Sequence, residues 1–362
     1  MVDVLRPKTV WVDGRCYRII SPLTDNTNVN YVEDDSCGFE DSAYQDEVEC
    51  GGEQLEEFQV EQLNNGKYQT SFPVANTYIS YVIGAKGATK KRIENETYTT
   101  LRFPGKGQSG DVVVIGKDVR TVRQARLKIQ MLVEQARKKQ PFTHFLSIPY
   151  NKPAIQTKFL EFKKEVLEKC GDCRGVDEAI FQYPGKLHQT LCVMVLADDR
   201  ERQQGLDALN KCPDNVLKKY LAGEKLRVEM RGIEYMNDNP GEVDVLYGRI
   251  NALSWSHSLQ TIADSLVDEF VKAGVVNRQH ERVKLHITLM NTAFRQDPDG
   301  VTDIKVGKDR ESFNARQIIE EFGDYYFGEM EVDEIHLSVR HTTANSGFYS
   351  ASGKIPILPH PA

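Results

Sequence analysis

The feature that most constrains this chain of 362 residues is a six-residue segment that occurs twice. KLHQTL at 186–191 and KLHITL at 284–289 agree at five of six positions and lie 98 residues apart. In KLHITL apolar and polar residues alternate, and KLHQTL keeps both leucines with Gln189 between them, which is typical of a strand with one buried face. A strand–helix–strand unit can be read around each copy. The pattern therefore predicts a duplicated, two-lobed α/β domain over residues 140–362.

The polar residues of the repeat suggest a chemistry. Residues i and i+2 of a strand point to one face, so His188 projects with Thr190 and His286 with Thr288. The flanking leucines then face a core: Leu187, Leu191, Leu285 and Leu289. Two such strands side by side would bring two imidazoles and two hydroxyls into one cleft.

This set suits phosphodiester chemistry. Imidazole titrates near pH ~6.5, so one ring can accept a proton while the other donates one. The hydroxyls can hold the non-bridging phosphate oxygens. The sequence thus predicts catalytic roles for His188, Thr190, His286 and Thr288, with neither a metal nor another cofactor required. The alternative is that these are core or surface histidines of duplicated strands.

A second motif, Gly84-Ala85-Lys86-Gly87, lies between two short predicted helices. Glycine at both ends of a tight turn lets a phosphate approach the backbone, and the start of the following helix favours anions. Residues 84–139 hold fourteen Lys or Arg against five Asp or Glu, a net charge of +9. We expect nucleic acid to contact Ile83, Gly84, Ala85, Lys86, Gly87, Lys90, Lys91 and Arg92.

Residues 67–139 around this motif predict one compact unit with the order strand, helix, helix, strand, strand, helix. The last helix is long and amphipathic, with one apolar face made by Val122, Ala125, Ile129, Leu132 and Val133. In residues 140–362 the last predicted strand is EVDEIHLSV, at 331–339.

Residues 1–66 differ in composition from the rest of the chain. Residues 19–66 hold thirteen Asp or Glu and no Lys or Arg, so with a total charge of −7 the remainder carries about +6. Residues 1–20 could form a short docking element. Residues 21–66 are too polar to offset the entropy of ordering, and we expect them to be mostly disordered. They are either a solvated loop or a segment that folds on a partner.

Other features bear less on function. No apolar run approaches the ~18 residues of a membrane span, and the start lacks the pattern of a signal peptide. Cys170 and Cys173 form a C-x-x-C without the second pair that zinc would need, and the seven cysteines read as reduced thiols. His341 lies in a polar stretch, and His336 reads as a structural histidine.

Two family resemblances rest on these motifs. Residues 67–139 resemble a type I KH domain, which implies a groove for about four nucleotides of single-stranded nucleic acid. The alternative is a KH-like module that has lost nucleic-acid binding. Two H-x-T motifs in a duplicated α/β domain resemble the two-histidine (2H) phosphoesterases, which include LigT-like RNA ligases and cyclic phosphodiesterases. The fold class expected is therefore α+β, with a type I KH domain before a two-lobed LigT-like domain.

The order of acidic segment, KH domain and 2H domain also resembles one family of subunits of a nuclear coactivator complex. That resemblance implies a nuclear location, a helicase partner bound through the N-terminal segment, and links to alkylation repair. We expect a metal-independent phosphodiesterase acting on single-stranded RNA ends or linkages. The alternative is a non-catalytic RNA-binding adaptor that tethers or regulates the helicase. Which histidine is the acid, and which RNA end is used, stay open.

Overall fold

The computed structural model divides into two units, residues 1–47 and 48–362. It describes residues 58–105, 108, 110–236, 238–253, 259–278, 280–295 and 310–357, together with the backbone of 9–12 and 15–18. In the first unit, β1 (Thr9–Val12) and β2 (Arg15–Arg18) form an antiparallel hairpin. The expected disordered segment lies mainly outside the described residues and stays a prediction.

The KH region has the expected element order. Its helices are α1 (Asn76–Ile83), α2 (Ala88–Thr97) and α3 (Val119–Lys138). The strands β3 (Glu61–Gln62), β4 (Tyr68–Pro73), β5 (Thr100–Arg102) and β6 (Asp111–Gly116) pair in the order β3-β4-β6-β5. The predicted apolar face of α3 packs on this sheet, with Val122, Ala125 and Ile129 fully buried.

Strand β3 corrects the expectation that residues up to 66 belong to the acidic segment. Residues 58–62 pack against the KH sheet instead. The Phe58 ring lies 4.0 Å from the guanidinium carbon of Arg126, which also donates to Thr70 Oγ1 at 3.0 Å. Thr70 in turn donates to the Gln59 carbonyl. The sequence concealed this strand because its side chains are polar and exposed.

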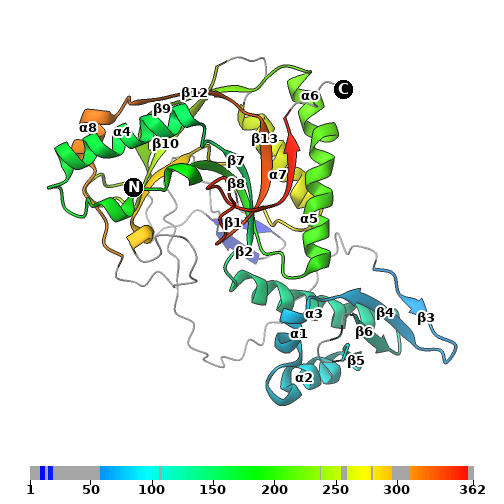
Figure 1. The fold of residues 1–362 in the computed structure, drawn as a ribbon. Helices are drawn as coiled ribbons and strands as arrows, with labels where there is room; N and C mark the ends of the chain where they lie inside the picture. The colour runs from blue at the N-terminus through cyan, green and yellow to red at the C-terminus, as the bar shows by residue number, and fades with distance from the viewer. Residues whose placement is uncertain are drawn as a thin grey trace. The chain divides into compact units, whose positions relative to one another are not determined.

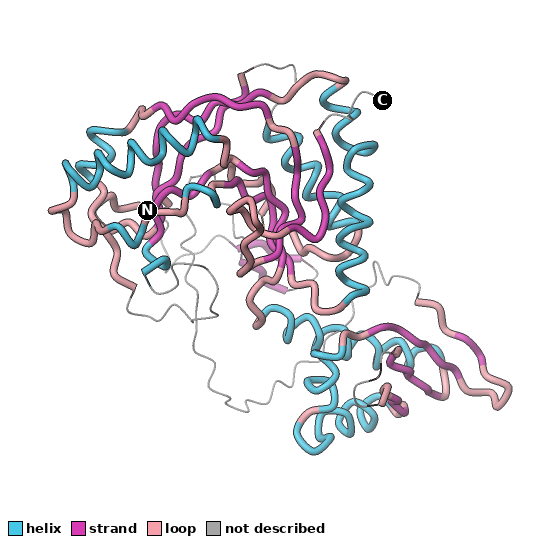
Figure 2. The backbone as a smooth tube through the Cα atoms, viewed as in Figure 1, coloured by secondary structure: helices cyan, strands magenta, loops and turns pink. Residues whose placement is uncertain are grey.

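The second region contains one eight-stranded antiparallel sheet with the order β12-β9-β10-β11-β8-β7-β13-β14 (Figures 1 and 2). One lobe consists of β7 (His144–Pro149), β8 (His188–Met194), β13 (Glu334–Val339) and β14 (Ala351–Pro356). The other consists of β9 (Arg227–Tyr235), β10 (Val245–Ala252), β11 (Ile287–Asn291) and β12 (Tyr326–Glu331). The two histidine-bearing segments therefore meet at the centre of the sheet, through β8 and β11.

The helices cover the lobes crosswise. Helix α4 (Pro153–Cys170) follows β7 but packs on β12 of the other lobe, where α8 (Arg316–Phe322) contacts β9. Helix α5 (Asp199–Cys212) packs on β14, and α7 (Leu259–Lys272) packs on β8. Between α5 and β9 the chain adds a π-helical turn (Pro213–Leu217) and α6 (Lys218–Leu221). Because each lobe is covered by a helix from the other half, the domain folds as one unit with a single apolar core.

Near the C-terminus the structure differs from the expectation of a single last strand at 331–339. The segment read as one last strand, EVDEIHLSV, contains the connection between two strands that do not pair with each other. Its first residue, Glu331, closes β12, and residues 334–339 form β13, which pairs with β7 instead. A further strand, β14, follows and closes the sheet. The second lobe is thus inserted between β8 and β13 of the first.

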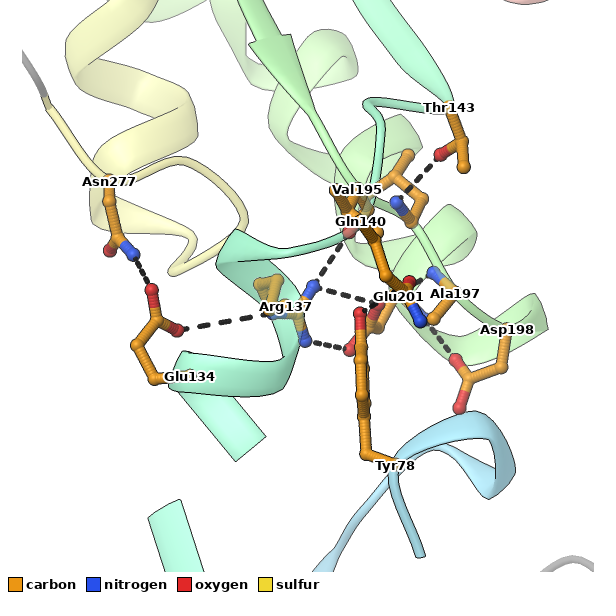
Figure 3. A network of polar contacts seen from close by, with 11 residues as sticks. Tyr78, Glu134, Arg137, Gln140, Thr143, Val195, Ala197, Asp198, Glu201 and Asn277 are labelled. Carbon is orange, nitrogen blue, oxygen red and sulfur yellow. Dashed lines mark hydrogen bonds and ion pairs between the residues drawn. The ribbon is translucent and has the colours of Figure 1, made fainter. Parts of the chain in front are cut away.

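A polar network connects the end of the KH helix α3 to the start of α5 (Figure 3). Arg137 donates to the Val195 carbonyl at 2.6 Å and forms a two-pronged ion pair with Glu201. Its guanidinium lies 5.1 Å from the centre of the Tyr78 ring, whose hydroxyl donates to Gln140. These contacts agree with the short junction after α3 and hold the two domains at this point.

Candidate active site

Both repeated histidines are held in the same way. His188 Nδ1 lies 2.7 Å from the Lys186 carbonyl, and His286 Nδ1 lies 2.8 Å from the Lys284 carbonyl. A carbonyl can only accept a hydrogen bond, so in each ring Nδ1 carries the proton. Each neutral ring therefore keeps the Nε2 lone pair for another partner. The local backbone thus fixes one tautomer for both histidines.

The central pairing brings the two motifs together. Gln189 of β8 lies opposite Ile287 of β11 in an antiparallel pair. In such a register each histidine neighbours the threonine of the other strand, and all four side chains share one face. We call His188, Thr190, His286 and Thr288 the histidine site. The electrostatic influence of His286 on His188 agrees with this proximity.

The opposite face of the two strands is buried, as predicted, with four leucines and the polar Gln189, which is 0% exposed. Leu187 and Leu289 are fully buried, Leu191 is 6% exposed, and Leu285 packs partly buried against the same core. Strand β11 begins at Ile287, so His286 itself lies just before the strand rather than inside it. The leucines therefore fix which way the histidines point, because a shift of one residue would expose them.

The two histidines differ in their surroundings. The His188 ring lies 5.2 Å from Phe145, 5.3 Å from Tyr349 and 6.2 Å from Phe348, measured between ring centres. Burial among these rings lowers the pKa of His188 to about 4. Among the residues that the structure describes, His286 has one aromatic neighbour, Tyr247, at 5.6 Å between ring centres.

Burial also lowers the pKa of His286, and the charge of Lys284 lowers it further. Both imidazoles of the free site are thus neutral at pH 7. A bound phosphate anion would favour the protonated form of one ring, because an opposite charge nearby stabilises imidazolium.

Two lysine–tyrosine pairs beside the histidines were not predicted as functional residues. Lys186 Nζ lies 5.0 Å from the centre of the Tyr349 ring, and Lys284 Nζ lies 4.8 Å from that of Tyr247. The Tyr247 hydroxyl donates to Glu234. Both lysines were visible in the repeated KLHxTL frame. Their tyrosines come from distant parts of the chain, so no sequence spacing could have indicated them.

The structure places the predicted KH contacts around one turn. Ile83 ends α1, residues 85–87 form a single 3₁₀ turn, and Lys90, Lys91 and Arg92 lie in the first half of α2. Gly84 has φ +70°, and a Cβ there would lie 2.2 Å from Thr89 Oγ1, so this position requires glycine.

The basic side chains at this turn differ in their exposure to solvent. Lys86, Lys91 and Arg92 are exposed, whereas Lys90 is half-buried, 3.9 Å from Glu94. The exposed charges thus lie where the free N–H groups of α2 begin, as an anion-binding turn requires.

The remaining candidates have structural surroundings. His336 is 4% exposed, and its Nε2 lies 2.8 Å from Glu334, as expected of a structural histidine. His341 has φ +59° in the turn after β13. Cys170 and Cys173 are free thiols. Within the described part of the chain, no three His, Cys, Asp or Glu residues cluster as metal ligands would, and no helix could cross a membrane.

Comparison with known families agrees with this architecture. A KH domain model matches residues 69–131, and the model of the AKAP7 2'5' RNA ligase-like domain matches residues 142–357. The fold and the repeated histidine motifs thus define a protein with an RNA-binding KH domain followed by a LigT-like 2H phosphoesterase domain.

A curated relative extends the match over almost the whole chain. Activating signal cointegrator 1 complex subunit 1 of Mus musculus is 37% identical over 362 residues, which cover 98% of this chain and 99% of the relative. The chain belongs to this family.

Solved structures match the second domain. Escherichia coli LigT is 14% identical, covers 61% of this chain and 100% of its own, and has a TM-score of 0.34. Thermus thermophilus TT0787 is 17% identical, with coverage of 60% and 100% and a TM-score of 0.37.

Proposed function

We propose that this protein is an RNA-binding phosphodiesterase that cleaves single-stranded RNA ends or linkages without a metal. One observation carries the proposal: both histidines of the repeat donate from Nδ1 to the carbonyl two residues before them. Two imidazoles held with Nε2 available, on neighbouring strands, are the arrangement that paired acid and base catalysis requires.

The reaction follows from this geometry. One neutral imidazole accepts the proton of the attacking hydroxyl, either a 2′-hydroxyl or water, as its oxygen bonds to phosphorus. The other, as imidazolium, donates its Nε2 proton to the leaving oxygen as the old P–O bond breaks. Thr190 and Thr288 donate hydrogen bonds to the non-bridging oxygens. Each positioned acid or base contributes roughly 10²–10⁴-fold. RNA is favoured over DNA because its 2′-hydroxyl can serve as the nucleophile.

The KH domain would supply the substrate strand, with its Gly84–Gly87 turn holding the backbone. The relative's name describes a subunit of a complex. For this chain we propose a nuclear location and a helicase-containing complex that acts in coactivation and alkylation repair. The N-terminal segment is the proposed docking element for the helicase. Support for docking comes from its composition, since residues 19–66 carry thirteen acids and no base.

The test is cleavage of labelled single-stranded RNA with 3′-hydroxyl, 3′-phosphate or 2′,3′-cyclic ends, in the presence of chelator. Variants H188A and H286A should each lose at least about a hundredfold in rate while still binding RNA. His341→Asn is the matched control, because His341 also precedes a threonine but lies outside the histidine site. Asparagine tolerates its positive φ.

A second function, that of a non-catalytic RNA-binding adaptor, is favoured by the acidic segment. It predicts tight RNA binding and no product on any end. Two results would contradict the phosphodiesterase proposal. One is cleavage that stops when chelator removes metal ions, and the other is cleavage that continues in both histidine variants.

A further inference from the structure

The two lysine–tyrosine pairs repeat the symmetry of the histidine site. In each lobe the lysine two residues before the histidine places its ammonium over a tyrosine ring. That ring stands nearly perpendicular to the imidazole, at 80° for Tyr349 and His188 and at 74° for Tyr247 and His286. An ammonium over an aromatic face is held by the ring quadrupole, so each lysine is fixed beside its histidine.

The surroundings of these two lysines differ from those of ordinary surface lysines. Lys186 is only 7% exposed. Lys284 is exposed overall, but desolvation still lowers the pKa of its ammonium. Both ammonium groups also act electrostatically on the neighbouring imidazole. One cation thus lies near each imidazole.

The strand register separates the two lysines along the sheet. Gln189 lies opposite Ile287, and the strands run antiparallel. Lys186 and Lys284 each precede their member of this pair by three residues, so they lie beyond opposite ends of the histidine site. Lys186 ends the 3₁₀ turn Pro184–Lys186 just before β8, and Lys284 lies just before β11 begins at Ile287. The order along the strands is therefore cation, histidine site, cation.

We propose that Lys186 and Lys284 bind the two phosphates that flank the scissile phosphate, so that the preferred substrate is an oligonucleotide rather than a mononucleotide. This inference rests on the proposed function and specifies its substrate class. The scissile diester carries one negative charge, for which the imidazolium and the threonines suffice. Two further cations on opposite sides correspond to a strand that continues in both directions, with its backbone running along β8 and β11.

The test compares the wild type, Lys186→Met and Lys284→Met, all as full chains, on three RNA tetranucleotides whose central linkage is the scissile one. One substrate has ordinary phosphates. In the other two, a neutral methylphosphonate replaces the phosphate on the 5′ or on the 3′ side of the scissile linkage. Methionine preserves the length of the lysine side chain. Lys219→Met is the matched control, because Lys219 Nζ lies 4.8 Å from the Tyr220 ring on α6, outside the histidine site.

In the wild type and in Lys219→Met, each methylphosphonate should lower kcat/KM about tenfold or more, the size of a lost charged hydrogen bond. In each lysine variant, one of the two methylphosphonates should no longer lower kcat/KM. If this is the 5′ methylphosphonate in one variant, it should be the 3′ methylphosphonate in the other. The ratio of kcat/KM values cancels any change in imidazole pKa, which affects all three substrates equally. If both variants keep both methylphosphonate effects, the lysines do not bind the flanking phosphates.

Failure of the proposed function would be recognised separately. It would appear as no turnover of any tetranucleotide by the wild type. The same nine combinations would then be compared by equilibrium binding, in an Ala85→Asp/Lys86→Asp background that repels phosphate from the KH turn. If a methylphosphonate weakens binding to the wild type but not to one lysine variant, that lysine binds a flanking phosphate even though no catalysis occurs. If each methylphosphonate weakens binding equally in both lysine variants, the proposed role of the lysines is wrong.

Discussion

The contact between α3 and the start of α5 makes a quantitative prediction about the coupling of the two domains. The Arg137 and Glu201 side chains are 23% and 15% exposed, so their ion pair lies between the surface and buried cases. Breaking a fully buried pair costs about 3–5 kcal/mol, and an exposed pair contributes about 0–1 kcal/mol. For Arg137→Met we expect a loss of about 2–3 kcal/mol, which includes its contact with the Tyr78 ring.

The assay is urea unfolding of the full chain, followed with one fluorescence probe in each domain. The matched control is Lys128→Met, because Lys128 lies on the same helix but pairs with Glu96 inside the KH domain, with 36% and 45% exposure. That change should cost less than about 1 kcal/mol. In Arg137→Met the KH transition should move to lower urea and separate from that of the second domain.

A double-mutant cycle with Glu201→Gln isolates the ion pair. Glu201 Oε2 also accepts from the Ala197 N–H at the start of α5, and glutamine keeps an oxygen for this bond. The coupling energy should be about 1.5–2 kcal/mol. A coupling below about 0.5 kcal/mol, with transitions that remain coincident in Arg137→Met, would show that this network does not couple the domains.

Two further predictions concern the sites themselves. If His188 is the base and His286 the acid, kcat/KM should peak between pH 4 and 6.5, because the active form needs His188 neutral above its pKa of about 4 and His286 protonated. Lys284→Met removes a charge that lowers the pKa of His286, so the alkaline limb should move to higher pH; an unmoved limb in a pH–rate profile would contradict this assignment. In the KH turn, Gly84→Ala should destabilise the domain by about 1–2 kcal/mol and weaken RNA binding, because it adds a steric clash to backbone strain. Gly87→Ala, with φ +80° and open space around the added Cβ, should show the strain alone, and equal costs in urea unfolding would refute the clash.

Local patterns predicted most of the elements. The alternation of KLHQTL and KLHITL indicated the buried leucines and the shared face of histidine and threonine, because a period of two depends only on neighbouring residues. The glycine at 84 predicted the end of α1 for a similarly local reason. The pairing of β13 with β7 could not be read in this way. Its partners lie about 190 residues apart, as Ser147 and Ser338 do, and no local signal specifies such a pairing.

The two lobes repeat a motif, but the two histidines lie in different surroundings. His188 is surrounded by rings from β7 and from the segment just before β14. Strand β14 belongs to the same lobe as His188 but follows the whole second lobe in the sequence. Within the described residues His286 has a single ring neighbour, Tyr247 from β10, whose hydroxyl donates a hydrogen bond to the Glu234 carboxylate. Burial opposes charge more strongly at His188, so His188 is suited to accept a proton from the nucleophile and His286 to hold one for the leaving group. Insertion of one lobe into the other thus makes two copies of a motif chemically unequal, as acid–base catalysis requires.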